Sequence, residues 1–334
     1  MTAIDPGFAR KARDSAAAPV VYAAPMIRTE MNGRDWAILG ALALIWGGAF
    51  FFINVAVHHV PPLTYVLLRL SIAAAGLWAV LWWRGETLTL PLHAWSAILL
   101  LALLNNALPF TLFGWAQTHI ASGLASILNA TTPIWGVIVA HLFTADERIT
   151  PRKLAGVLLG FGGVALMIGP GLVGSLGGSG VLAELACVAA ALAYALAGVW
   201  ARRFKVMGVS PFSVTTGQLT AGAVMMLPIA LIGDHPWSMP WPPLSAWAAI
   251  VALALLCTAF GYVLYFKLIE SSGATNALLV TLLVPPTAIL LGVLFLGEVI
   301  APFDLAGLGL IAIGLAAIDG RILNWLRRRR PLPA

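Results

Sequence analysis

The sequence is poor in charge, poor in cysteine and free of any long polar segment, and each absence excludes a class of protein. Charged residues make up only 10% of the 334 residues, whereas 60% are hydrophobic, a balance that excludes a water-soluble globular domain. The two cysteines, Cys187 and Cys257, both fall inside apolar stretches, which predicts neither a disulfide framework nor a metal site. No gap between these stretches is long enough for a soluble domain, so we expect the function to lie among apolar helices.

Lysine and arginine are also missing from every second gap between the apolar stretches, while all but one of the 19 lie in the remaining gaps and tails. Each stretch is long enough to cross a hydrocarbon core of about 30 Å. We therefore predict ten membrane spans, at 35–57, 63–82, 95–116, 122–143, 152–169, 180–201, 212–231, 244–267, 274–296 and 302–320. By the positive-inside rule both termini are cytoplasmic, and we expect a multi-pass protein of the cell inner membrane.

The two halves of the chain share a faint repeat, in which residues 115–166 resemble residues 265–317. Gly156 and Gly163, for example, correspond to Gly307 and Gly314. Five spans in each half would turn the second half over in the membrane, and such inverted repeats are common in secondary transporters. Duplication without transport is the alternative.

These observations predict an all-α integral membrane protein with ten transmembrane helices in two inverted five-helix repeats. The expected parts are a cytoplasmic N-terminal tail (1–34), a first repeat (35–170), a periplasmic linker (171–179), a second repeat (180–320) and a basic cytoplasmic tail (321–334).

Several motifs mark particular spans, and one of them recurs in both halves. They are Trp46 and Gly47 in the first span, Pro62 to Arg69 in the second, and Glu147 or Glu298 with a Leu-Ala-Gly triplet around the last helix pair of each half. With these motifs the chain, over about 35–320, resembles the drug/metabolite transporter superfamily, and within it the EamA-type exporters and the bacterial aromatic amino-acid exporters. The resemblance implies export of amino acids or related metabolites. Gln218 stands where the first half has Arg69, and Tyr194 where it has Trp46, so the halves need not contribute equally.

Amide and hydroxyl side chains gather in the middle of two predicted spans. Asn105 and Asn106 lie in the third span, and Asn129 and Thr132 lie in the fourth. Because polar groups are costly in hydrocarbon, they tend to face protein or a water-filled cavity. The alternative is that each amide only joins packed helices.

Prolines follow these polar residues. Pro109 and Pro133 cannot donate a backbone hydrogen bond, which frees carbonyl groups near Asn105 and Asn129 that another polar group must satisfy. We expect helix kinks at Pro109, Pro133, Pro285 and Pro286.

Aromatic residues lie at a similar depth and give the predicted pocket an apolar side. Rings and amides without a carboxylate or lysine suit a neutral or zwitterionic solute with an apolar side chain. Taken singly, each ring is more commonly a packing residue. The predicted substrate-binding residues are Trp46, Asn105, Asn106, Asn129, Thr132, Trp135, Tyr194, Phe260 and Tyr262.

Arg69 is the one cation within a span, about two turns from its outer end. Its guanidinium can snorkel to the interface or pair with a carbonyl group or an acid such as Glu184 or Glu298. We predict a gating or structural role.

The most economical function is secondary transport of an amino acid by alternating access, down the gradient of the solute itself. A proton-driven pump needs an ionisable relay inside the membrane, and the sequence suggests none. A polytopic enzyme acting on a lipid-linked substrate would need clustered His, Asp or Glu at one interface, and His58 and His59 are the only adjacent histidines. A channel would need a continuous polar stripe. We expect a monomer with no catalytic residues, no metal or other cofactor and no nucleic-acid partner, in contact with a small-molecule substrate and membrane lipids.

Overall fold

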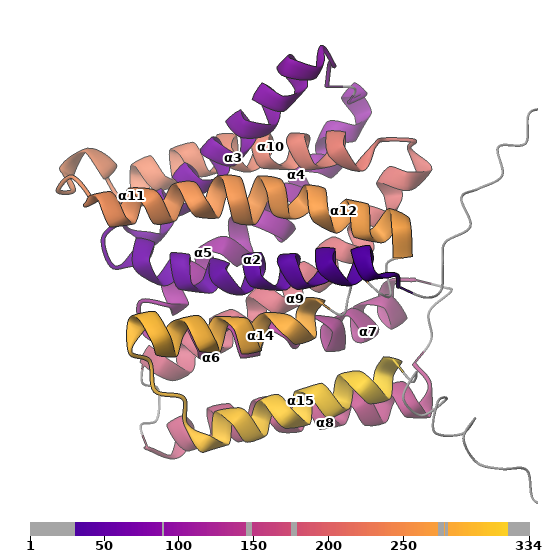
Figure 1. Cartoon of the computed structure of the whole chain (residues 1–334), viewed down its shortest axis with the longest axis vertical. Coiled ribbons are helices and arrows are strands. Elements are labelled where there is room, and N and C mark those ends of the chain that lie inside the picture. The colour runs from indigo at the N-terminus through magenta and orange to yellow at the C-terminus, as the bar shows by residue number, and fades with distance from the viewer. Residues whose placement is uncertain are drawn as a thin grey trace, which may run out of the picture.

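The computed structural model describes residues 31–88, 90–144, 149–174, 179–272, 277 and 280–319, and these form helices without any strand. In chain order the elements are α2 (Gly33–Val57), α3 (Pro62–Arg84), η1 (Leu92–Ala94), α4 (Trp95–Ala102), η2 (Leu103–Ala107), α5 (Leu108–Ala116), α6 (Ser122–Asn129), α7 (Thr132–Phe143), α8 (Pro151–Gly174), α9 (Ser179–Val206), α10 (Pro211–Gly233), η3 (Pro236–Ser238), α11 (Leu244–Val251), η4 (Ala252–Phe260), α12 (Gly261–Ser272), α14 (Val280–Leu291), η5 (Gly292–Leu296) and α15 (Pro302–Asp319). Many of the long helices run side by side (Figure 1).

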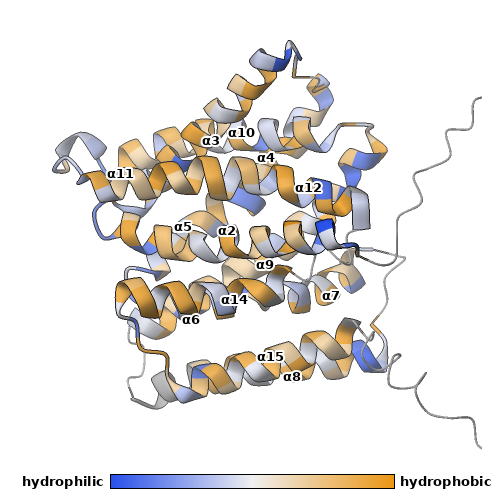
Figure 2. Ribbon diagram, viewed as in Figure 1, coloured by the Kyte–Doolittle hydropathy of each residue, from blue (hydrophilic) through white to orange (hydrophobic). Residues whose placement is uncertain are grey.

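Seven helical segments are long and apolar enough to cross a membrane. They are Gly33–Val57, Pro62–Arg84, Leu92–Ala116, Ser122–Phe143, Ser179–Val206, Pro211–Gly233 and Leu244–Ile269, with Leu283–Leu296 and Pro302–Ile318 as shorter apolar helices. Hydrophobic residues dominate along these helices in Figure 2. The chain is therefore an all-helical, multi-pass membrane protein, and these segments coincide with predicted spans.

Some predicted boundaries differ from the structure or lie outside its described part. Helix α8 extends to Gly174, into the linker expected over 171–179, and α2 begins at Gly33 rather than at residue 35. Most of the N-terminal tail, the tail over 321–334 and Glu147 lie outside the described residues.

Helices α8 and α15 form a closely packed pair at one edge of the bundle (Figure 1). A Cβ atom added to Gly156 would lie 2.5 Å from the Gly314 carbonyl oxygen, and one added to Gly163 would lie 2.6 Å from the Gly307 carbonyl oxygen. The two backbones are thus in direct contact, which only glycine allows. The glycines that correspond between the two halves therefore serve packing within the chain.

Polar contacts join helices at the end of the bundle where α2 begins and α15 ends (Figure 1). Asp35 and Asn32 cap the start of α2, and the Ser271 hydroxyl near the end of α12 donates to Asp35 Oδ1 at 2.7 Å. Trp200 Nε1, from the last part of α9, donates to the Ala97 carbonyl oxygen in α4 at 2.9 Å. The charge pattern assigns all these positions to the cytoplasmic side.

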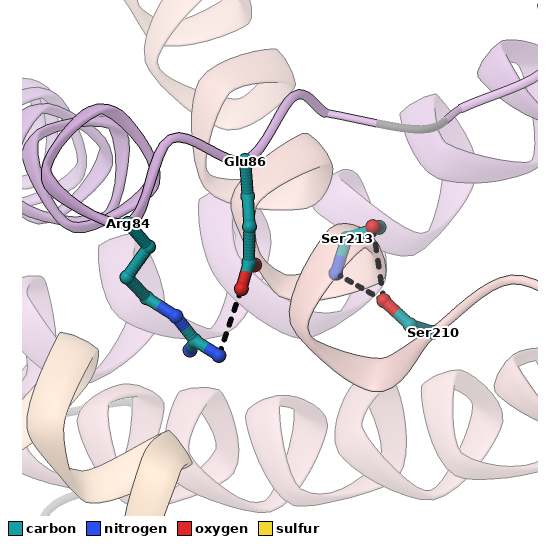
Figure 3. A network of polar contacts seen from close by, with 4 residues as sticks. All are labelled: Arg84, Glu86, Ser210 and Ser213. Carbon is teal, nitrogen blue, oxygen red and sulfur yellow. Dashed lines mark hydrogen bonds and ion pairs between the residues drawn. The ribbon is translucent and has the colours of Figure 1, made fainter.

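Local contacts also fix the chain at this end, beside the end of α3 and the start of α10 (Figure 3). Arg84 Nη2 pairs with Glu86 Oε1 at 2.9 Å on the exposed surface. The Ser213 backbone N–H donates to Ser210 Oγ at 3.1 Å, which caps α10.

At the opposite end, carboxylates accept backbone hydrogen bonds from other helices. The Thr64 N–H donates to Asp234 Oδ2 at 2.6 Å. The Ser122 and Gly123 N–H groups donate to Glu298 Oε1 and Oε2 at 2.6 and 3.0 Å, so Glu298 caps the start of α6. The charge pattern assigns these positions to the periplasmic side, so each of these contacts joins ends that the predicted topology places together.

Cysteine labelling tests which end is cytoplasmic. The native Cys187 and Cys257 are buried, so they leave a low background. In spheroplasts, Ser238→Cys, at an exposed position in the gap after α10, should react with a membrane-impermeant maleimide. Val206→Cys, 91% exposed at the end of α9, should react only after permeabilisation. Labelling of Val206→Cys in intact spheroplasts would reverse the assigned orientation.

Candidate substrate-binding site

Two helices change from α to π geometry at corresponding places in the two halves. The third predicted span is interrupted by η2 (Leu103–Ala107), and the eighth by η4 (Ala252–Phe260). Pro109 is the second residue of α5, two positions after the end of η2, and removes one backbone donor from the helix. Segments of π-helix occur frequently at functional sites because they turn side chains and carbonyl groups out of the regular pattern.

The fourth predicted span is broken between α6 and α7. Helix α6 ends at Asn129 and α7 begins at Thr132, followed by Pro133. The Thr132 hydroxyl donates to the Asn129 carbonyl oxygen at 2.7 Å. In a regular helix this carbonyl would accept from residue 133, but Pro133 has no backbone N–H. The expectation that a polar side chain would satisfy this freed carbonyl is confirmed.

A cluster of polar side chains links η2, α10 and α12. Asn105 Nδ2 donates to Gln218 Oε1 at 3.0 Å and lies 3.1 Å from the Tyr262 hydroxyl, to which it also donates. Asn106 Nδ2 donates to the same Gln218 oxygen at 3.3 Å. Asn106 and Gln218 are buried, and Asn106 Oδ1 has no partner among the described residues. We call these four residues the amide cluster.

Arg69 forms a second group, within the bundle. Its Nε donates to Thr258 Oγ1 at 3.0 Å, and its Nη1 donates to the Tyr65 hydroxyl at 3.3 Å. The guanidinium carbon lies 3.6 Å from the centroid of the Phe110 ring, a cation–π distance. Arg69 is only 6% exposed, so it does not snorkel.

The two acids suggested as partners of Arg69 lie in other surroundings. Glu298 caps α6. Glu184 Oε2 is buried and has no hydrogen-bond partner among the described residues. In the described part of the chain, Arg69 pairs with neither acid.

The amide cluster and the Arg69 group connect the two halves reciprocally. Arg69 reaches from α3 to Thr258 in η4, and Gln218 reaches from α10 to Asn105 and Asn106 in η2. Each half therefore contributes a polar side chain from its second span to the π segment in the third span of the other half. The two groups share the same spans, because Phe110 follows Asn106 by four residues and Tyr262 follows Thr258 by four residues.

Aromatic residues pack beside the polar groups. Trp46 Nε1 donates to the Cys257 carbonyl oxygen in η4 at 3.1 Å, and its ring centroid lies 5.2 Å from that of Tyr265. The Tyr194 ring stacks on Phe113 with centroids 6.2 Å apart. These residues supply ring faces next to the polar centre.

The other predicted site residues make local contacts. Asn129 contacts Thr132. The Trp135 ring packs edge-on against Phe161 of α8 at 4.9 Å, and its Nε1 is buried without a partner in the described residues. Phe260 is 47% exposed. Pro285 and Pro286 lie inside α14. None of the described contacts joins these residues to the amide cluster.

Three polar residues of the centre were not among the predicted site residues: Gln218, Thr258 and Tyr65. Gln218 had been singled out only as the counterpart of Arg69 in the second half. The signal that would have found it is a large amide within an otherwise apolar span, which is costly unless satisfied. Thr258 and Tyr65 carry no such signal, because threonine and tyrosine are common in spans.

Known proteins match the chain along most of its length. The EamA-like transporter family model matches twice, at residues 35–169 and 181–318. The uncharacterized transporter YoaV of Bacillus subtilis is 27% identical over 82% of this chain and 93% of its own. The uncharacterized inner membrane transporter YedA of Escherichia coli is 28% identical over 84% of this chain and 89% of its own.

A further relative is named for the class of its substrate, and one solved structure supports the fold. A probable terminal-alkyne amino-acid exporter of Streptantibioticus cattleyicolor is 30% identical over 65% of this chain and 70% of its own. A crystal structure with 21% identity covers 90% of this chain and 100% of its own, with a TM-score of 0.60. The two successive family matches together span most of the described helices, and the relatives are transporters rather than enzymes. The chain belongs to the EamA-like transporter family.

Proposed function

We propose that this transporter exports small neutral or zwitterionic metabolites, most readily aromatic or other apolar amino acids, across the inner membrane. The observation that carries the proposal is the amide cluster, because its hydrogen-bonded side chains lie within helices that are long and apolar enough to cross a membrane. Amides and hydroxyls bind the polar ends of a zwitterion, and the rings of Trp46 and Tyr194 accommodate an apolar side chain. The amino-acid exporter among the relatives has a substrate of this class.

The transport mechanism that we propose is alternating access by two inverted five-helix halves. Two successive matches to one family model support a repeat, and the π segments η2 and η4 recur in corresponding spans. The reciprocal contacts of Arg69 and Gln218 lie between the halves, where a rocking motion would change them. The bonds between the neutral amides of Gln218, Asn105 and Asn106 can exchange during such a motion at small cost.

Alanine substitutions in the fourth span test whether it lines the substrate path. Asn129 and Trp135 flank the break between α6 and α7, and the Trp135 indole N–H is buried without a partner among the described residues. We expect Asn129→Ala and Trp135→Ala each to lower amino-acid export at least severalfold, because each removes a polar group from the proposed path. Efflux from preloaded proteoliposomes measures the effect.

Trp82→Ala is the matched control, because Trp82 is 84% exposed near the end of α3. It should export at the normal rate, and the elution profile in detergent should remain that of the wild type in all three variants. Normal export by both Asn129→Ala and Trp135→Ala would remove the fourth span from the substrate path.

A further inference from the structure

Arg69 has only neutral partners in the described part of the chain. Its Nε and Nη1 donate to the hydroxyls of Thr258 and Tyr65, and Phe110 covers one face of the guanidinium. A guanidinium held deep among helices is costly unless an anion compensates its charge. Neutral hydroxyls and a ring offset only part of that cost.

None of the acidic side chains that the structure describes pairs with Arg69. The carboxylates of Asp35 and Asp234 accept backbone hydrogen bonds at helix starts, as Glu298 does at the start of α6. Asp304 accepts the Ala301 N–H at the start of α15. Of the remaining two, Glu86 pairs with Arg84, and Glu184 forms no ion pair in the described part of the chain, where its buried Oε2 has no hydrogen-bond partner.

The guanidinium retains one free edge. Nη2 makes no hydrogen bond to a described residue. It is also not one of the fully buried polar atoms that lack a partner, so part of its surface is accessible. The hydroxyls of Tyr194 and Tyr262 lie within electrostatic range of Arg69. Arg69 thus keeps N–H donors that no described residue occupies, between Thr258 of η4 and Tyr65 of α3.

We propose that Arg69 binds the carboxylate group of the transported solute. This inference rests on the proposed amino-acid transport and specifies which part of the substrate is recognised. A guanidinium matches a carboxylate with parallel N–H···O bonds, which are stronger than bonds between neutral groups. The substrate class is then a solute with a free carboxylate and an apolar side chain, whose side chain lies toward Phe113 and Tyr194.

A purely structural Arg69 would behave differently toward ligands. If it only holds α3 against η4 through Thr258, its loss weakens the protein without changing which solutes bind. If it binds the carboxylate, its loss removes the preference for acids over their neutral derivatives. Ligand selectivity therefore separates the two roles.

The experiment compares phenylalanine with phenylalaninamide, which keeps the ring and the amine but lacks the carboxylate. Binding to purified wild-type protein and counterflow in proteoliposomes are measured for both. We expect a preference for the acid of roughly tenfold or more, as a charge-assisted hydrogen-bond pair provides. In Arg69→Gln the preference should fall close to unity, whereas Arg84→Gln, the same change at an exposed arginine, should retain it.

Each outcome bears on a separate statement. Equal binding of acid and amide by the wild type overturns the role of Arg69, and so does an Arg69→Gln variant that loses both ligands equally while remaining folded. If Arg69→Gln does not fold, Arg69→Lys is measured beside the wild type, because lysine keeps the charge but not the planar fork. A smaller preference of Arg69→Lys for the acid over the amide supports the proposal. An unchanged preference contradicts it. Failure of the wild type to bind or transport any amino acid or amide instead overturns the proposed function.

Discussion

Replacing Gly163 with leucine should lower the free energy of unfolding by roughly 3 kcal/mol or more. A Cβ atom at this position would lie 2.6 Å from the Gly307 carbonyl oxygen and 3.0 Å from Ile311 Cγ1. Because the first of these atoms belongs to the backbone, it cannot turn aside as a side chain does, and α8 must separate from α15. Thermal unfolding of the purified protein in detergent measures the loss.

The next residue supplies a matched control. Gly162 is exposed on α8, and a Cβ atom added there meets nothing within 4 Å. Gly162→Leu should therefore change stability little, although it makes the same chemical change in the same helix. Equal melting temperatures for Gly162→Leu and Gly163→Leu would mean that α8 and α15 are not in backbone contact.

Glu298→Ala should destabilise the protein by about 3 kcal/mol, because hydrogen bonds to a charged group contribute about 1.5–3 kcal/mol each. The carboxylate accepts two bonds, from the backbone N–H groups of Ser122 and Gly123 at 2.6 and 3.0 Å. Its removal leaves the start of α6 without a cap. Glu298→Gln keeps one carbonyl acceptor and should lose about half as much, as measured by thermal unfolding in detergent.

Glu86→Ala is the control for this pair of variants. Glu86 pairs with Arg84 on the exposed surface (Figure 3), where an ion pair contributes roughly 1 kcal/mol or less. Loss of this ion pair should change the melting temperature very little. A Glu298→Ala variant as stable as Glu86→Ala would show that the bonds to α6 contribute nothing to the fold.

Much of the fold could be predicted from the sequence because hydrocarbon imposes simple rules. An apolar run must be long enough to cross, and its backbone must be satisfied within the helix, so the long apolar helices coincide with predicted spans. The freed carbonyl at Asn129 followed from Pro133, since proline has no backbone donor.

The contacts of the candidate site could not be predicted, because one sequence does not specify how helices are rotated against each other. Asn105 and Asn106 were recognised as costly polar residues, but nothing in the sequence identified Gln218 as their shared acceptor. The neighbours of Arg69 were missed for the same reason. A position along a span gives depth in the membrane, whereas its partners depend on the face that each helix presents.

Counterflow in proteoliposomes tests the central claim most directly, since it requires only that one carrier exposes the same site to both sides. Vesicles loaded with unlabelled phenylalanine are diluted into buffer with a trace of labelled phenylalanine, with and without an ionophore that collapses the pH difference. The proposed alternating access, down the gradient of the solute, predicts that label accumulates transiently at similar rates in both conditions. Absence of accumulation for phenylalanine, leucine and other apolar amino acids, with correctly inserted protein, would contradict the account.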